Sequence, residues 1–334
     1  MPTFRSEVFP LQFREKINYS DKIVFLGSCF AENIGAKLQE LKLQINLNPF
    51  GIIYNPASIA QSIEYILLAK KFAQEDLEYY NEKWISFNHH GKFSSPNANE
   101  TLLLINSELQ TAYDYLKNAS HLFITFGTSW VYKLKRTGQI VANCHKLPSN
   151  EFEHYALSVH EILEIYISLL HKIKAFNDKI NIIFTVSPVR HWKDGPIENQ
   201  YSKSVLLVAV HDLVKQFEFA SYFPSYEIMM DDLRDYRFYS EDLFHPNQIG
   251  IDYIWEKFKE CYFNTETIEI ASKIEKVVKS VQHKVFYPQT LAYRKFITNC
   301  IGLINELKNK HDGLQLDKEL DYFENEFKKY FAEK

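Results

Sequence analysis

The sequence predicts an α/β protein with a doubly wound parallel sheet, followed by a helical C-terminal appendage. Short apolar runs without polar alternation recur along most of the chain, as in strands that are buried on both faces of a sheet. Patterns of helical length separate these runs, and strands that alternate with helices form a parallel sheet rather than a sandwich. After about residue 264 the buried runs stop and only helical periodicity remains.

The first strand and helix lie at the start of the chain. Residues 22–26 form an apolar run that ends at Gly27, and residues 31–41 place apolar side chains at helical spacing. Turn signals follow, and Pro56 is suited to the first turn of a helix over residues 56–72.

The middle of the chain alternates hairpin, helix and strand patterns. Residues 84–94 alternate like a hairpin, residues 101–117 are helical, and residues 121–126 form a second buried strand. A further hairpin is predicted over residues 130–144, turning at Arg136-Thr137-Gly138.

The last part of the sheet domain repeats the strand and helix pattern. The predicted strands are residues 179–186 and 225–230, and the predicted helices are residues 159–175, 202–217 and 249–262. We therefore expect an α/β catalytic domain over residues 1–263 and a helical extension over residues 264–334.

Composition excludes several classes of protein. The net charge of −4 leaves no basic footprint for nucleic acid, and no apolar run reaches bilayer length. The N-terminal residues lack a signal-peptide pattern. Four scattered cysteines, without paired spacing, favour neither a disulfide framework nor a zinc site. We expect a cytoplasmic protein without a metal or cofactor, and without a nucleic acid or membrane partner.

Two motifs at opposite ends of this domain carry chemistry. Gly27-Ser28-Cys29 forms a strand-to-helix elbow, and Asp242 precedes His245 by three residues. Acyl transfer requires a nucleophile, a base and a group that orients the base. His245 is the candidate base, and Asp242 can accept its Nδ1 proton. Alternatively, Asp242 and His245 only cap a helix and hydrogen-bond to each other. The Gly27-Ser28-Cys29 elbow in the same domain favours the catalytic interpretation.

The residues Gly27-Ser28-Cys29-Phe30-Ala31 spell the motif of the GSCFA proteins, which this chain resembles over about its first three quarters. That family is similar to the SGNH (GDSL-like) hydrolases. The resemblance implies a flavodoxin-like SGNH fold and an enzyme that cleaves esters or transfers acyl groups. The elbow of those hydrolases reads Gly-Asp-Ser, so Cys29 holds the place of their serine.

The nucleophile has three interpretations. Cys29 ranks first, because register selects it and a helix start should depress its thiol pKa. Ser28 ranks second as the attacking group, with Cys29 as a packing residue. In the third interpretation Ser28 is only a helix cap.

The tetrahedral intermediate of acyl transfer also needs hydrogen-bond donors. The resemblance suggests Gly51 and, in the turn after the second strand, Ser129, where those esterases have Asn. Asn143 is an alternative, because the hairpin could return it to the site. Simple turn chemistry is the competing interpretation for Ser129.

The loop after residues 179–186 is rich in polar and aromatic residues and follows the carboxyl end of a strand, where ligands bind. It predicts a substrate-binding set of His191, Trp192, Lys193 and Asn199. A solvated loop with a buried Trp anchor is the alternative.

We therefore expect a hydrolase that acts on carboxylic esters of small molecules or carbohydrates, including O-acyl groups on sugars. Two alternatives stay open: an acyltransferase with a cysteine thioester intermediate, and a non-catalytic relative that binds a glycan or a protein.

Overall fold

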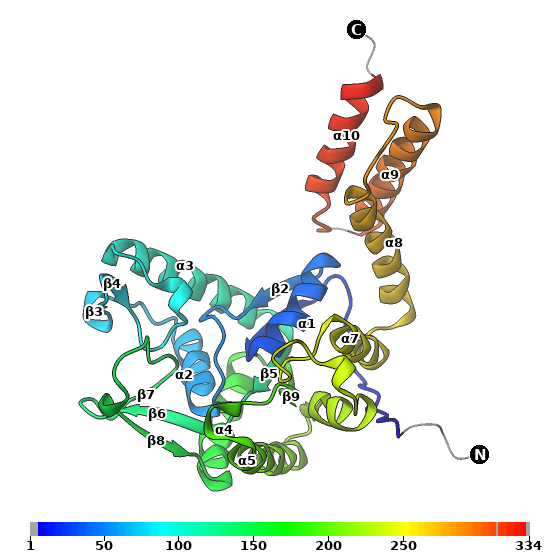
Figure 1. Ribbon diagram of the computed structural model, residues 1–334. Helices are drawn as coiled ribbons and strands as arrows, with labels where there is room; N and C mark the ends of the chain where they lie inside the picture. Colours follow the sequence, from blue (N-terminus) through cyan, green and yellow to red (C-terminus); the bar gives the residue numbers. More distant parts are fainter. Residues whose placement is uncertain (1–5, 312, 332–334) are drawn as a thin grey trace. The chain divides into compact units, whose positions relative to one another are not determined.

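The computed structural model describes residues 6–311 and 313–331, and its central element is a five-stranded sheet (Figure 1). The strands are β1 (Lys22–Gly27), β2 (Gln44–Leu47), β5 (Ala119–Phe126), β9 (Asn181–Val186) and β10 (Ala220–Tyr222). They are ordered β2-β1-β5-β9-β10, and the pairs β1–β5, β5–β9 and β9–β10 are parallel. This is the 2-1-3-4-5 order of a doubly wound sheet, which places the switch point between β1 and β5.

Helices connect the strands of this sheet, as the sequence predicts, and a further helix follows the last strand. They are α1 (Cys29–Glu40), α2 (Pro56–Leu67), α3 (Ala98–Lys117), α4 (Val159–Phe176), α5 (Pro196–Gln216) and α7 (Gln248–Tyr262). Local sequence explains several starts. Pro56 occupies the first turn of α2, and Ser158 with Glu161 forms a capping box on α4.

Alternate side chains of the strands enter two apolar layers. Leu26, Ile124 and Phe184 belong to a core that also contains residues of α2, α3, α4 and α5. On the opposite face, Phe123 stacks on Phe25, with ring centroids 4.4 Å apart, and also contacts Phe258 of α7. Burial on both faces explains why these strands are apolar without alternation.

The predicted strand over residues 225–230 is wrong. This segment is a helical turn, α6 (Ser225–Glu227), followed by a π-helical turn, Ile228–Asp232. The Ser225 hydroxyl donates to Val186 O and lies 2.7 Å from the hydroxyl of Thr185, which fixes the turn against the end of β9. Strands β10 and β2 form the two edges of the sheet, and the sequence pattern revealed neither of them.

Two small sheets flank the central one. The predicted hairpin over residues 130–144 is confirmed: β6 (Trp130–Leu134) pairs with β7 (Ile140–Val141) and also with β8 (Phe152–Ala156). The predicted hairpin over residues 84–94 is wrong. Instead, β3 (Glu78–Tyr80) pairs with β4 (Lys83–Ile85), and only a single bridge joins Trp84 to Ser95.

The C-terminal region is helical, with α8 (Thr265–Val281), α9 (Leu291–Lys310) and α10 (Asp317–Phe331). The described residues divide into two compact units: residues 6–11, 22–35 and 45–258 form the first, and residues 12–21, 36–44, 259–311 and 313–331 form the second. In the second unit, Ile274, Ile304 and Phe323 are fully buried. Within residues 6–311 and 313–331, no helix combines the length and apolar composition that a bilayer crossing requires.

Candidate active site

The elbow after β1 brings Ser28 and Cys29 to the carboxyl edge of the sheet. Gly27 has φ +140°, and a Cβ at this position would lie 2.2 Å from Thr125 O, so only glycine fits. The side chain of Asn48 links the turn to helix α1. Its Oδ1 accepts from Gly27 N at 2.9 Å, and its Nδ2 donates to Glu32. Helix α1 therefore begins immediately after the strand.

Ser28 occupies the capping position of α1. Its side chain is buried, and its Oγ accepts from Phe30 N at 3.3 Å. This is the hydrogen bond that a capping serine makes with the second residue of a helix. Ser28 therefore caps the helix, as the third interpretation predicts. Among the described residues, no imidazole is hydrogen-bonded to the Ser28 hydroxyl.

Cys29 is the first residue of α1, and its thiol is half-buried. Burial raises the pKa of this thiol above its ordinary value, although the Lys203 ammonium and the backbone N–H groups of Cys29 and Phe30 act in the opposite direction. This direction is opposite to the depressed pKa expected from the helix start alone. The free protein therefore holds Cys29 as a thiol at neutral pH.

Asp242 and His245 share a tight loop that is closed on itself before α7. The His245 Nδ1 lies 2.7 Å from Asp242 Oδ2, and Asp242 Oδ1 accepts from the backbone N–H groups of Phe244 and His245. These backbone bonds, together with the imidazole, lower the pKa of the Asp242 carboxyl to about 2. Leu243 adopts φ +62°, a left-handed conformation that turns the loop. Asn247 caps α7 by accepting from Gly250 N at 3.1 Å.

The two motifs meet at one small pocket. Ser28, Cys29 and His245 line it together with Tyr54, Gly127, Ser187, Val189, Arg190 and His191, around a cavity of about 170 Å³. The loops after β1, β5 and β9 all contribute, so the pocket lies beside the switch point of the sheet. The structure thus brings nucleophile and base candidates from distant parts of the chain to one place.

Lys203 contacts two residues that line this pocket, and no sequence motif predicted a role for it. It projects from α5, is fully buried, and donates to Gly127 O at 2.8 Å and to Ser187 O at 2.7 Å. Burial lowers its pKa to about 7, and Arg190 acts in the same direction. Its ammonium therefore joins the loops after β5 and β9 and supplies positive charge near Cys29. Helical spacing was the available signal: Lys203 shares the apolar stripe of Leu206, Val210 and Leu213.

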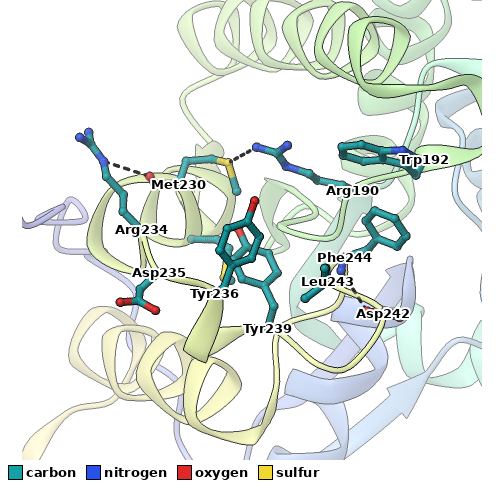
Figure 2. A pocket seen from close by; sticks show the side chains of 11 residues that line it. Arg190, Trp192, Met230, Arg234, Asp235, Tyr236, Tyr239, Asp242, Leu243 and Phe244 are labelled. Carbon is teal, nitrogen blue, oxygen red and sulfur yellow. Dashed lines mark hydrogen bonds between the residues drawn. The ribbon is translucent and has the colours of Figure 1, made fainter.

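The four predicted substrate-binding residues lie in different surroundings in the structure. His191 lines the small pocket, and burial lowers its pKa. Trp192 lines a neighbouring larger pocket, shown in Figure 2, where its ring lies 4.9 Å from that of Phe244. Asn199 is buried and accepts from His191 N, so it positions the loop, and Lys193 donates to the Tyr132 hydroxyl. Neither Lys193 nor Asn199 lines either of these two pockets.

The three candidate oxyanion donors lie outside the lining of the small pocket. The Gly51 N–H donates to Asn48 O at 2.7 Å, and the Ser129 N–H donates to the Ser202 hydroxyl at 2.7 Å. Asn143 accepts from His145 N through its side chain. Cys29 lines the pocket, and its N–H, in the first turn of α1, has no intrahelical acceptor.

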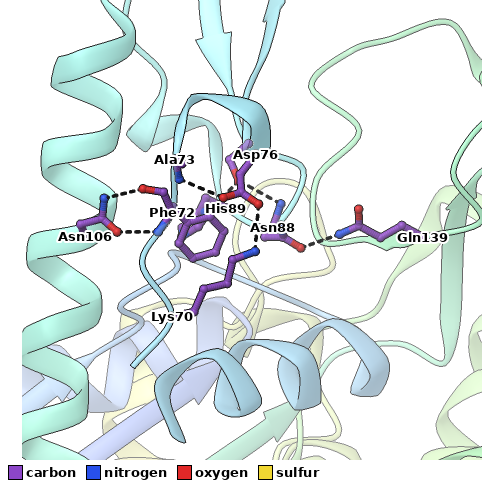
Figure 3. Close-up of polar contacts among 9 residues, drawn as sticks. Lys70, Phe72, Ala73, Asp76, Asn88, His89, Asn106 and Gln139 are labelled. Carbon is purple, nitrogen blue, oxygen red and sulfur yellow. Dashed lines mark hydrogen bonds and ion pairs between the residues drawn. The ribbon is translucent and has the colours of Figure 1, made fainter. Parts of the chain in front are cut away.

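A network of polar contacts surrounds Phe72 and Asp76, as Figure 3 shows. The Asn106 side chain bonds to both Phe72 N and Phe72 O, and Lys70 pairs with Asp76. His89 stacks on Phe50 at 4.6 Å, and burial lowers the pKa of its imidazole to about 3. His89 is thus a neutral core residue. In the part of the chain that the structure describes, no three His, Cys, Asp or Glu side chains gather as a metal site.

Comparison with known proteins agrees with the elbow motif. The sequence matches the GSCFA family over residues 22–258, and it matches the C-terminal domain of GSCFA domain proteins over residues 274–329. A search of curated proteins finds no match. The first of these matches covers well over half of the chain and includes both motifs of the small pocket. The chain therefore belongs to the GSCFA family.

Proposed function

We propose that this protein is an SGNH-type hydrolase that cleaves carboxylic esters through a Cys29 acyl-enzyme. The observation that carries the proposal is the small pocket itself: Cys29, at the start of a helix, and His245, oriented by Asp242, both line it. The doubly wound order of the sheet and the position of the pocket at its switch point agree with such an enzyme.

The reaction follows from the protonation states of these groups. Because burial holds Cys29 as a thiol, attack requires a base, and His245 Nε2 accepts the thiol proton as the S–C bond forms. Asp242 accepts from Nδ1 and stabilises the imidazolium. The C–O bond then breaks, and the imidazolium gives its proton to the leaving alcohol.

Water completes the cycle. His245 takes a proton from a water molecule that attacks the thioester carbonyl, the C–S bond breaks, and the proton returns to sulfur as the carboxylic acid leaves. The Cys29 N–H donates to the oxyanion in both steps. An alcohol in place of water gives the acyltransferase, which uses the same residues.

Substitution of the two elbow residues tests this proposal. With acetyl esters of nitrophenol and of sugars as substrates, Cys29→Ala should lower kcat/KM by at least about 10³-fold. Ser28→Ala should keep measurable turnover and lose about 1 kcal/mol of stability, because it removes a helix cap. Cys144→Ala, at a half-buried cysteine outside the pocket, is the control.

Three results would change the assignment. An active Cys29→Ala with an inactive Ser28→Ala makes Ser28 the nucleophile. Turnover of esters only when a sugar acceptor is present indicates the acyltransferase. Full activity in both elbow variants, or no turnover of any ester by the native protein, refutes the catalytic role and leaves a binding protein.

A further inference from the structure

A second, larger pocket lies next to the small one and shares Arg190 with it. Its cavity measures about 500 Å³, and its walls include Trp192, Met230, Tyr239 and Phe244 (Figure 2). No step of the proposed reaction uses this space. Its position beside the reacting groups makes it the natural place for the rest of a substrate.

Arg190 enters this pocket without a carboxylate partner among the described residues. Its Nε is buried with no hydrogen-bond acceptor, and its Nη2 donates a hydrogen bond to the sulfur of Met230, at 3.6 Å. Arg190 acts to lower the pKa values of Lys203, Tyr226 and Tyr239, and none of these three groups offers it a carboxylate. A partly buried guanidinium without an anion is costly, and its planar fork matches a carboxylate or a phosphate.

Aromatic rings border this cation. The guanidinium of Arg190 lies 5.9 Å from the centroid of the Trp192 ring, and Trp192 packs against Phe244. Tyr239 belongs to the same wall. Such walls accept a planar or apolar group next to the anion.

The position of His245 decides which half of an ester enters this pocket. Asp242, Leu243 and Phe244 line the larger pocket, whereas His245, the next residue, lines the smaller one. Because the imidazolium must give its proton to the leaving oxygen, the alcohol half lies on the side of this loop.

We propose that the larger pocket binds the alcohol portion of the substrate through an anionic group, a carboxylate or a phosphate, that pairs with Arg190. This inference rests on the proposed function for the orientation of the ester. The anion site itself rests on the unpaired guanidinium and the cavity.

Binding is tested first, without turnover, in the Cys29→Ala protein. Fluorescence titration, with Trp192→Phe to identify the reporter, should show phenyl phosphate or benzoate binding at least tenfold more tightly than benzyl alcohol. Arg190→Gln should weaken the binding of the anions by about tenfold or more and leave benzyl alcohol unchanged, and Arg190→Lys should restore part of the loss. Arg136→Gln is the control, because Arg136 is exposed, pairs with Glu78 and lines neither pocket.

Turnover is tested next in the native protein. The acetyl ester of 4-hydroxybenzoate should have a kcat/KM at least tenfold above that of 4-hydroxybenzamide acetate, and Arg190→Gln should remove this preference. Equal binding of phenyl phosphate, benzoate and benzyl alcohol overturns the anion site, even if esters are hydrolysed. Tight, Arg190-dependent binding without hydrolysis of any ester keeps the anion site and refutes the esterase.

Discussion

The burial of Lys203 should make the free energy of unfolding depend on pH. An ammonium with a pKa near 10.5 in the unfolded chain has a pKa of about 7 in the fold. Between these values the unfolded state binds more protons, so stability rises with pH. Below pH 7 both states are charged, and the full cost of burying the cation is present.

Lys203→Met should therefore flatten the dependence of stability on pH. In the native protein the free energy of unfolding should increase by up to about 1.4 kcal/mol for each pH unit between pH 7 and 9.5 because of this group. The variant should lack this increase. Urea unfolding at several pH values measures it, and Lys215→Met, which removes an exposed ammonium from the same helix, is the control. Parallel curves for Lys203→Met and native protein would contradict the assignment.

At the scale of elements, the loop before α7 is organised by one carboxylate. Asp242 accepts two backbone N–H groups and the imidazole, so Asp242→Asn should disturb the tautomer and orientation of His245. We expect kcat to fall by about 10²- to 10⁴-fold with a small loss of melting temperature. Glu241→Gln, at the adjacent exposed carboxylate, should retain the native rate.

The same carboxylate predicts an acid transition. Its pKa of about 2 lies below that of an unfolded aspartate, so its contribution to stability is present above about pH 4 and is lost as the pH falls towards 2. Melting temperatures of the native protein should fall in this interval more steeply than those of Asp242→Asn. Identical slopes would mean that the carboxylate does not hold the loop.

The elements also show what a sequence can and cannot predict. The strands β1, β5 and β9 were predictable because burial on both faces leaves uninterrupted apolar runs. Strands β2 and β10 have only four and three residues, too few for a periodicity. Tyr226, Ile228 and Met229 are buried in a helical turn, and periodicity over so short a run does not distinguish such a turn from a strand.

The candidate site likewise contains residues that the sequence predicts and residues that it does not predict. Cys29 and His245 follow from local motifs, whose order along the chain implies that they meet at one sheet edge. Lys203 and Arg190 depend on which side chain of a helix or loop reaches the pocket, and on which carbonyls and rings surround it there. These surroundings depend on the tertiary structure, and the local sequence pattern predicts them only in part.

At the scale of the whole molecule, each of the two compact units contains buried apolar side chains. Phe323 is fully buried in the helical unit, and Phe323→Ala should cost about 3–5 kcal/mol there. Hydrogen exchange of the intact chain should show faster exchange in α8, α9 and α10, with β5 and β9 unchanged. Glu324→Ala, at the next position of α10, is the control. Uniform acceleration over both units would show that they unfold together.

The raised pKa of the Cys29 thiol has a consequence for the survival of the protein under oxidants. Peroxide reacts with thiolates, so a cysteine that is ionised only while a substrate is being attacked spends little time in a form that becomes sulfenic acid. We expect the resting protein to tolerate peroxide that inactivates cysteine enzymes with acidic thiols, with an inactivation rate that rises with pH. Mass spectrometry of the Cys29 peptide after peroxide treatment measures that rate, and rapid sulfinic acid formation at neutral pH would contradict it.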